Sequence, residues 1–422
     1  MTLANDIRHT EYITQLARHM VSVPPTSTKS QKRGGVALII RLVTDKPEEF
    51  PRFHSSNISG SKAPAELIQS IHRFVNHPVL QSSQAQVLFI QRAKYPGDPW
   101  SGHIGFPGGK REKSDISDRQ TAERETMEEL GLDLSDTEKF CYMGRLDDTS
   151  VLTFFDKLIM VVSPNVYLQV VAKTPQLVIS DEVASVHWIG FEQFLKRIDC
   201  PVEPFSSDHK VIPVDIASRT FIRHIKSKPW WFRAFRQMFG NLHYTVLPLQ
   251  YTTENTVVGR KPRIITDDVS KPRELGLDYG DVKFATDSEL YLWGLSLVML
   301  CNLVDLSLPF DPRACNRRYI SIATPWPQMQ QYLWADFNWI VNTAHRFLWD
   351  HYSRKPWFLS MRTDRTGSRK VGQHMDYFRA FFRVSRMAFA VSCVFKTIAI
   401  YYSGKVVYSG LSYIVDGLSR KA

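Results

Sequence analysis

Three glutamates, Glu125, Glu128 and Glu129, lie close together directly after Arg124, in a run of good helix formers over residues 118–130. Their spacing of i, i+3 and i+4 places the three carboxylates on one face of a helix. Like charges on one face repel each other, whereas oxygen ligands gathered around one point are what Mg²⁺ or Mn²⁺ prefers. The alternative interpretation is a solvated acidic helix face without a ligand.

A glycine-rich turn precedes this helix. The residues Phe106-Pro107-Gly108-Gly109 suit neither a regular helix nor a regular strand. Glycine lets a phosphate approach the backbone closely, and the carbonyl of Gly108 or Gly109 is available as a metal ligand. His103 comes just before the turn, where it either contacts a phosphate or serves as a structural histidine in a tight loop. Together with the arginine and the glutamates, the turn favours a metal–phosphate site.

The ends of the acidic helix also have signals in the sequence. Asp118 or Thr121 is predicted to cap its N-terminus, because both side chains can accept a hydrogen bond from a free backbone N–H. Gly131 stands where a left-handed residue usually ends a helix. The pattern therefore predicts a helix that begins near residue 118 and ends at residue 130.

The stretch from Gly109 to Leu132 resembles the Nudix box, whose pattern is G-x5-E-x7-R-E-U-x-E-E-x-G-U, where U is a bulky aliphatic residue. There are three departures from this pattern. Asp115 stands where the first glutamate belongs, one extra residue separates it from the arginine, and Thr126 replaces the first aliphatic residue. The same departures, within a run like FPGGK…D…TA.RET.EE.GL, are similar to the branch of the superfamily that contains coenzyme A pyrophosphatases.

The resemblance implies a fold, an activity and a cofactor. The fold is an α/β/α sandwich with a mixed sheet, and the activity is hydrolysis of a nucleoside diphosphate linked to another moiety. The resemblance implies that Glu125, Glu128, Glu129 and the carbonyl of Gly109 bind Mg²⁺ or Mn²⁺. It further implies that Arg124 orients a glutamate through a charge-assisted hydrogen bond.

The general base and the substrate contacts are less well defined by this resemblance. Members often place the base on a loop outside the box, and Glu182, or Asp181 beside it, is the candidate here. Coenzyme A-type members have an arginine four residues before the glycine that corresponds to Gly102, but Asp98 occupies that place. A carboxylate cannot pair with the 3′-phosphate of the coenzyme as an arginine does. Coenzyme A, acyl-CoA, other nucleotide pyrophosphates and dinucleotides therefore all stay open. The nearby cations Arg92 and Lys94 are candidates for contacting the substrate.

The overall composition is that of a globular, basic protein. The 422-residue chain has a formal net charge of +11, which favours an anionic partner such as a phosphorylated substrate, an anionic lipid or a nucleic acid. No nucleic-acid reader motif accompanies the charge, so nucleic acid is not expected as a partner. The five scattered cysteines and the polar N-terminus predict an intracellular, reducing location, in the cytoplasm or at the surface of an organelle or membrane, and not secretion.

Hydrophobic periodicity predicts the elements that position the site. Strands are short apolar runs rich in β-branched residues, and helices have apolar residues three and four positions apart. Pro164 is expected to interrupt a strand. The predicted helices are 5–22, 64–77, 192–197 and 290–308, and the predicted strands are 36–43, 86–92, 140–146, 157–162 with a possible continuation over 166–170, 184–189 and 243–251.

These elements divide the chain into three parts. Residues 1–33 form an N-terminal helix and linker, and residues 34–308 form the Nudix-like domain, with insertions near 44–84 and 200–285. Residues 309–422 form a helical C-terminal extension. The helix 290–308 is expected to be buried in the domain, because a glycine, an asparagine and an aspartate within it weaken a membrane-spanning interpretation.

Two segments are candidates for membrane contact. Residues 219–240 interleave basic and aromatic side chains, which indicates either a membrane-surface helix or an inserted amphipathic helix packed on the core. Residues 377–402 are apolar nearly all round, as in a helix that is buried in a bundle or dips into lipid. A second function class also stays open: a non-catalytic scaffold that binds a membrane or a protein. The complete glutamate triad favours the enzyme.

Overall fold

The computed structural model describes most of the predicted domain and one long C-terminal helix. The described residues are 9–22, 29–54, 63–94, 102–152, 157–194, 211–215, 241–259, 289–308, 328–330 and 373–419, with a few single positions between 230 and 347. Asp98 and residues 195–210 and 260–288 lie outside this part, and so do residues 219–240 except the exposed Trp230.

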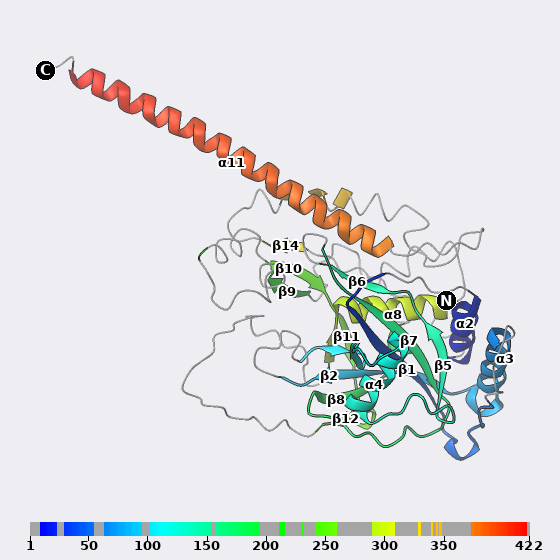
Figure 1. Cartoon of the computed structure of the whole chain (residues 1–422). Helices are drawn as coiled ribbons and strands as arrows, with labels where there is room; N and C mark the ends of the chain where they lie inside the picture. The colour runs from blue at the N-terminus through cyan, green and yellow to red at the C-terminus, as the bar shows by residue number, and fades with distance from the viewer. Residues whose placement is uncertain are drawn as a thin grey trace.

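A nine-stranded mixed sheet forms the centre of the fold (Figure 1). Its middle strand is β1 (Arg33–Val43), which pairs in parallel with β7 (Leu158–Gln169) and antiparallel with β2 (Gln84–Arg92). The strand order along the main path is β12-β8-β2-β1-β7-β5, and three short strands pair at its sides. The remaining strands are β3 (Ile104–Gly105), β4 (Gly108–Lys110), β5 (Phe140–Arg145), β6 (Thr149–Leu152), β8 (Val183–Gly190) and β12 (Thr256–Val258).

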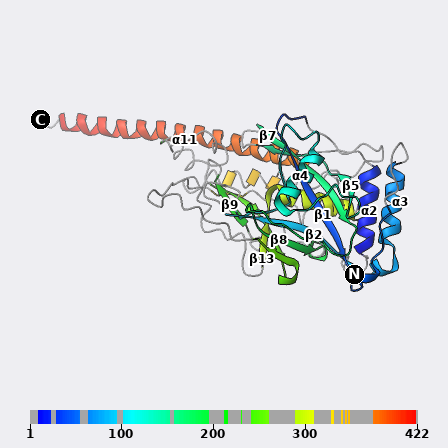
Figure 2. The ribbon, with the colours of Figure 1, turned by 60° about the horizontal axis from the view of Figure 1, so that its bottom comes forward.

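The two faces of the sheet have separate cores, because alternate side chains of a strand point to opposite faces. Leu38 and Ile40 of β1 join a cluster with α2 (His9–Ser22), α3 (Ala63–Val75) and α8 (Gly294–Ser307). Ala37 and Ile39 join a second cluster with Ala122 and Leu130 of α4 (Asp118–Leu130). Figure 2 shows α2 and α3 side by side at one edge of the fold, and the two helices contact each other. This arrangement confirms the predicted α/β/α sandwich with a mixed sheet.

The acidic helix α4 has the predicted span but a different N-cap. Ser117 has an extended backbone and its side chain accepts a hydrogen bond from the backbone N–H of Gln120, so the prediction of Asp118 or Thr121 as the cap was wrong. Asp118 and Thr121 instead lie within the helix and use their side chains for other contacts. Gly131 ends the helix in the left-handed conformation, with φ of 68°, as predicted.

Strand β7 continues through Pro164, so the expectation that this proline interrupts the strand was wrong. On one side, β7 pairs with β6 up to Val162 and with β5 from Asn165 onward. Pro164 lies opposite the connection between those two strands, where its carbonyl accepts a hydrogen bond from the N–H of Leu146. Its missing N–H therefore removes no bond from either pairing.

The predicted helices 5–22 and 64–77 and the other predicted strands are present with shifted ends, whereas residues 195–197 of the predicted helix 192–197 lie outside the described residues. The apolar run 290–308 begins as strand β13 (Glu289–Leu292) and becomes helix α8 only at Gly294, whose φ is 62°. Helix α8 is buried in the main core, as expected. The run 243–251 is two strands in different sheets, β10 (Asn241–Thr245) and β11 (Leu247–Gln250).

Several short elements complete the described part. Strand β10 pairs with β9 (Val211–Asp215) and with β14 (Gln328–Gln330), so a strand lies within the extension that was predicted to be helical. Strand β11 pairs with β13. Three 3-10 turns are η1 (Pro47–Glu49), η2 (Pro78–Leu80) and η3 (Thr253–Asn255). Beyond them, helix α11 (Gln373–Ser419) projects from the body of the molecule (Figure 1).

Candidate functional site

Close packing of β1, β4 and α4 builds the site, and glycines make this packing possible. Gly35 of β1 pairs with Gly109 of β4 in an antiparallel register. A Cβ on Gly35 would overlap the carbonyl oxygen of Asp118, at the start of α4. A Cβ on Gly109 would overlap the carboxylate of Glu125. The glycines therefore let the helix lie against the sheet, and they bring one of its carboxylates onto the glycine turn.

Glu129 is the most buried of the three glutamates. It is 4% exposed, and its Oε2 accepts a hydrogen bond of 2.9 Å from the backbone N–H of Gly108. Burial raises the pKa of the Glu129 carboxyl to about 8, because it disfavours the charged form. The carboxylates of Glu125 and Glu182 raise this pKa further, whereas the Gly108 N–H and the cation of Arg92 lower it.

The other two glutamates differ from Glu129 in exposure. Burial also raises the pKa of Glu125, and its Oε1 accepts a bond of 3.0 Å from Nη2 of Arg124. Glu128 has 58% of its side chain exposed and accepts two bonds from Nη1 of Arg124, at 3.1 and 3.2 Å. Arg124 therefore holds two of the glutamates, Glu125 and Glu128. Of the three glutamates, only Glu128 is largely exposed to solvent.

Asp115 fixes Arg124 and does not join the carboxylate group. Its two oxygens accept bonds of 3.1 Å from Nε and Nη2 of Arg124, and the side chain of Thr121 and the N–H of Glu112 donate to it as well. The hydrogen bonds from Arg124 lower the pKa of Asp115 to about 2. Asp115 is thus a buried anchor for the arginine, which in turn holds Glu125 and Glu128.

The predicted residues from outside the box lie next to the glutamates. The backbone N–H of Ala93 donates to the carbonyl of Glu182 at 2.8 Å, and the N–H of Arg92 donates to the carbonyl of His103 at 3.0 Å. Arg92 and Glu182 both act on the pKa of Glu129. The ring of His103 packs on Trp293, with 5.0 Å between the ring centroids. The fold therefore brings Arg92, Gly108, Gly109 and Glu182 to the three glutamates, whereas the His103 ring packs on Trp293.

The donor chemistry of this group fits a divalent cation. In the described part of the chain, no three His, Cys, Asp or Glu side chains are already drawn into a metal-binding cluster. The carboxylates of Glu125, Glu129 and Glu182 nevertheless share one region, where each of the other two raises the pKa of Glu129. A cation placed among them would relieve this repulsion, and carboxylate and carbonyl oxygens are the ligands that Mg²⁺ and Mn²⁺ prefer.

Sequence reasoning missed Arg33, which fastens the site to the sheet. Arg33 was assigned to a linker but begins β1. Its Nη2 lies 2.6 Å from Asp118 at the start of α4 and 2.8 Å from Asp148, which is also paired with Arg145 at 2.8 Å. These partners are 85 and 115 residues away in the sequence, so no local pattern identifies them. The only local hint is the pair of glycines that follows the arginine.

Comparisons with known proteins find a NUDIX domain within this part of the chain. Residues 71–207 match the family model of the NUDIX domain. The chain is 30% identical over 182 residues to an uncharacterised protein of Schizosaccharomyces pombe, a match that covers 43% of this chain and 51% of that protein. The chain therefore spans about half the length of the curated relative that it matches.

Solved structures with detectable similarity include three of different origin. The NUDIX domain of Shewanella oneidensis NrtR, complexed with ADP ribose, is 16% identical, with 43% of this chain and 86% of that chain covered and a TM-score of 0.22. A Caenorhabditis elegans Ap4A hydrolase is 15% identical, with 37% and 77% covered and a TM-score of 0.21. A bifunctional NMN adenylyltransferase/ADP ribose pyrophosphatase of Francisella tularensis, complexed with AMP and an Mn ion, is 16% identical, with 43% and 39% covered and a TM-score of 0.23.

Proposed function

We propose that this chain, whose residues 71–207 match the NUDIX domain, hydrolyses the pyrophosphate bond of a nucleoside diphosphate linked to another moiety. The observation that carries the proposal is the position of Glu125 and Glu129 against the glycine turn, next to Glu182 and Arg92. In this arrangement, closely spaced acidic oxygens and a cation face a backbone that a phosphate can approach.

Each residue of the group has a role in this proposal. Glu125, Glu128, Glu129 and the carbonyl of Gly109 would hold Mg²⁺ or Mn²⁺. The metal, when bound, withdraws charge from the pyrophosphate oxygens and lowers the pKa of water. Arg124, fixed by Asp115, keeps two of the glutamates in place. Glu182 is the proposed general base, since its carboxylate acts on the pKa of both Glu125 and Glu129.

The substrate contacts are proposed for Arg92 and His103, whose backbones are joined by a hydrogen bond and which precede the glycine turn in the sequence. The positive charge of Arg92 acts on the pKa of Glu129, and a guanidinium in this region is suited to bind a phosphate of the substrate. Coenzyme A or acyl-CoA is the finer proposal, based on the resemblance of the FPGGK motif. The aspartate at position 98 argues against a coenzyme 3′-phosphate contact at that position.

The complete set of carboxylates also argues against the alternative function, a scaffold without catalysis. A scaffold has no need for a buried glutamate whose charged form is costly, and Glu129 is such a residue. The cost of burying this carboxyl is understandable where it binds a cation. The scaffold is therefore kept only as an outcome of the experiment.

The experiment is a hydrolysis panel with product identification by mass spectrometry. The purified full-length protein is incubated with coenzyme A, acyl-CoA, NADH, ADP-ribose and diadenosine polyphosphates, each with Mg²⁺, with Mn²⁺ and with a chelator. We expect metal-dependent cleavage of at least one compound at its pyrophosphate or polyphosphate linkage, and no cleavage by Glu129→Gln. Cleavage of coenzyme A to 3′,5′-ADP and a phosphopantetheine would support the finer proposal.

Two other results would change the proposal. Cleavage of a different compound alone would remove the protein from the coenzyme A-like branch and keep the hydrolase. Absence of cleavage across the panel, with Mn²⁺ shown to bind by electron paramagnetic resonance, would favour the scaffold.

A further inference from the structure

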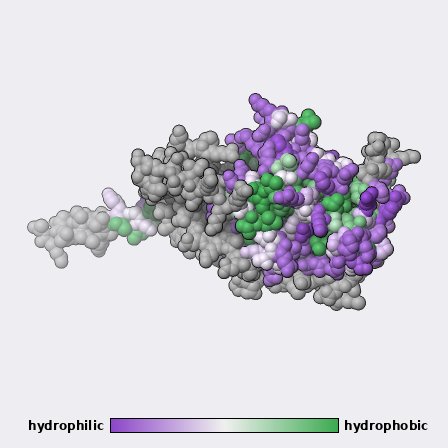
Figure 3. Space-filling view, turned by 90° about the horizontal axis from the view of Figure 1, so that it is seen from below, coloured by the Kyte–Doolittle hydropathy of each residue, from purple (hydrophilic) through white to green (hydrophobic). Residues whose placement is uncertain are grey.

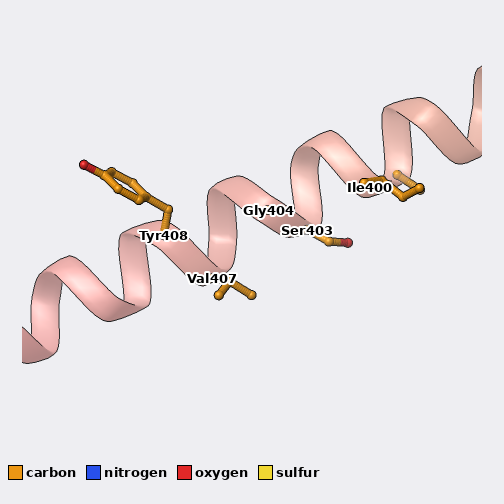
Figure 4. Close-up of a pocket in the computed structure, with 6 residues that line it drawn as sticks. Ile400, Ser403, Gly404, Val407 and Tyr408 are labelled. Carbon is orange, nitrogen blue, oxygen red and sulfur yellow. The ribbon is translucent and has the colours of Figure 1, made fainter.

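Beyond Lys396, the described surface of helix α11 exposes large apolar side chains on more than one side, and Lys405 is the one charged residue among residues 397–409. Every residue from Thr397 to Ser409 is exposed, including Ile400 at 73%, Val406 at 72% and Tyr408 at 77%. Figure 4 shows Val407 and Tyr408 on opposite sides of the helix, so the exposure is not confined to one side. Water is a poor solvent for such a surface, and another medium or molecule must cover it.

The part of α11 before Lys396 has two distinct faces. Ser385, Ala388 and Ser392, at i, i+3 and i+7, are buried against the rest of the molecule. The amino group of Lys396 binds the hydroxyl of Ser392 and therefore lies toward this buried face. On the other face, large apolar side chains are exposed at helical spacing: Met387, Val391, Val394, Phe395, Ile398, Tyr401 and Tyr402. Small residues thus pack on the protein, whereas large ones face outward.

A second copy of the helix is the first occupant to consider. Met387, Val391, Val394, Ile398 and Tyr401 alternate four and three positions apart, as in the seam of a coiled coil. A soluble coiled coil has charged residues beside its seam and polar residues on its outer face. Here Phe395 and Tyr402 lie beside the seam, and Ile400, Val406 and Val407 lie outside it. Pairing of two such helices would leave these apolar side chains in water.

The length and the charges of the helix favour a lipid bilayer instead. The stretch Arg383–Ser409 is long and apolar enough to cross a membrane, and 18% of its most apolar window is buried. At 1.5 Å per residue these 27 residues extend about 40 Å, compared with a hydrocarbon layer of about 30 Å. Arg383 and Arg386 lie at the end near the body, and Lys405 lies over the ring of Tyr401 at 4.9 Å. Basic residues and tyrosines are typical of membrane–water interfaces.

We propose that helix α11 is a bilayer anchor: the exposed apolar side chains from Ile398 to Tyr408, beyond the part of the helix that packs on the protein, enter lipid and hold the NUDIX domain at a membrane surface. The helix projects from the body, so insertion leaves the sheet and the glycine turn in water (Figure 1). Figure 3 shows hydrophobic residues on the described part of the helix, and a body surface that is largely hydrophilic around a hydrophobic patch near its centre. This inference does not depend on the proposed hydrolysis.

The experiment is flotation of the full-length protein with vesicles of neutral phosphatidylcholine, in low and in high salt. We expect the protein to float in both, because insertion of apolar side chains does not depend on charge attraction. The double variant Ile400→Glu/Val407→Glu should reduce the partition coefficient by more than about tenfold, because a charge in the hydrocarbon layer is costly. Both side chains are exposed, so the substitutions remove no packing within the protein.

The matched control is Val178→Glu/Val258→Glu. These two side chains are 67% and 74% exposed on the body of the molecule, and the change in charge is the same. Flotation of this variant should equal that of the wild type. The proposal is overturned if the wild type stays at the bottom of the gradient, or if it floats only with anionic vesicles at low salt. It is also overturned if light scattering shows a dimer that Val394→Glu/Ile398→Glu dissociates and Ile400→Glu/Val407→Glu does not.

Discussion

At the residue scale, the site depends on the absence of a side chain as much as on the presence of carboxylates. Gly109 leaves space for the carboxylate of Glu125, and the N–H of Gly108 reaches Glu129 because the turn passes directly over the helix. The same packing excludes water from Glu129 and raises its pKa. The glycines of the turn and the glutamates of the helix therefore form one structural unit, although they lie in separate parts of the sequence.

Gly109→Ala tests this feature directly. The added methyl group would overlap the Glu125 carboxylate, which is the end of a flexible side chain and can rotate away. We expect a loss of about ten- to a hundredfold in kcat for pyrophosphate hydrolysis, since a displaced catalytic group is costly. The melting temperature should change little.

Gly105→Ala is the matched control, because the nearest atom to a new Cβ there is the Ser296 hydroxyl at 3.2 Å, which is not part of the site. Its kcat should stay near that of the wild type. A Gly109→Ala enzyme with parental kcat would show that the position of Glu125 does not matter for the reaction.

The residue types of the site could be predicted from the sequence, but their partners could not. Arg124, the glutamates and the glycine turn form one continuous motif whose chemistry is readable from spacing alone. The anchoring role of Asp115 also needed the hydrogen-bond geometry, since its carboxylate contacts Arg124 and not the other carboxylates. Arg33 required the tertiary fold, because its two acidic partners come from α4 and from the connection after β5.

At the element scale, the identity of helices and strands could be predicted from local sequence. The predictions failed where contacts with neighbouring elements determine how an element begins or continues. The ends of α4 were predicted to within one residue, because the run of helix formers and Gly131 are local signals. Ser117 lies one residue before this run of helix formers, so the run itself does not identify it as the N-cap. The continuity of β7 depends on its pairing with β5 and β6, which leave Pro164 opposite the connection between them. The sequence of β7 alone does not contain this information.

The pairing of β8 with β12 at the edge of the sheet includes a histidine that makes the stability of the protein depend on pH. His187 of β8 is buried between the hydroxyls of Ser185 and Thr256, at 2.7 and 3.1 Å, and beside the ring of Tyr251. Burial lowers the pKa of His187 to about 4, from an ordinary value of 6.5. The unfolded chain therefore takes up a proton at a higher pH than the folded chain does.

The expected result is a loss of stability as the pH falls from about 6.5 toward 4. The contribution of His187 is fully present above pH 6.5, and its loss reaches up to about 3 kcal/mol in the free energy of unfolding at the lower end. Urea denaturation of the wild type and of His187→Gln over this pH range gives the free energy of unfolding at each pH, and the slopes of this free energy against pH are compared. The exposed His72→Gln is the control and should behave like the wild type. Equal slopes for wild type and His187→Gln would contradict the assignment.

At the scale of the whole molecule, the N-terminal helix is part of the same core as the predicted domain. Tyr12, Ile13 and Leu16 of α2 are buried in the cluster that contains α8, and Nδ1 of His19 lies 2.7 Å from the carbonyl oxygen of Leu306. The division into residues 1–33, 34–308 and 309–422 stays a prediction. The packing of α2 could not be predicted, because its amphipathic pattern gives the buried face but not the partner.

Leu16→Ala tests whether α2 and the domain unfold as one unit. Leu16 is fully buried, and its truncation should lower the free energy of unfolding by about 2–5 kcal/mol. Denaturation monitored by tryptophan fluorescence should move to lower urea concentration with an unchanged slope. The exposed Arg18→Ala on the same helix should have little effect. If Leu16→Ala left the midpoint unchanged, α2 would be an independent segment.

Metal-dependent hydrolysis at the three glutamates is tested most directly by kcat of Glu128→Gln and Glu129→Gln with the best substrate of the panel. Both variants should lose at least about a hundredfold in kcat. Because Glu129 is buried, the melting temperature of the Glu129→Gln variant must be measured as well. We expect it to be close to that of the wild type, since glutamine has the same shape and its side-chain oxygen can accept the hydrogen bond from the Gly108 N–H. The exposed Glu138→Gln is the control and should keep the parental kcat. Parental rates in both folded variants would contradict the assigned site.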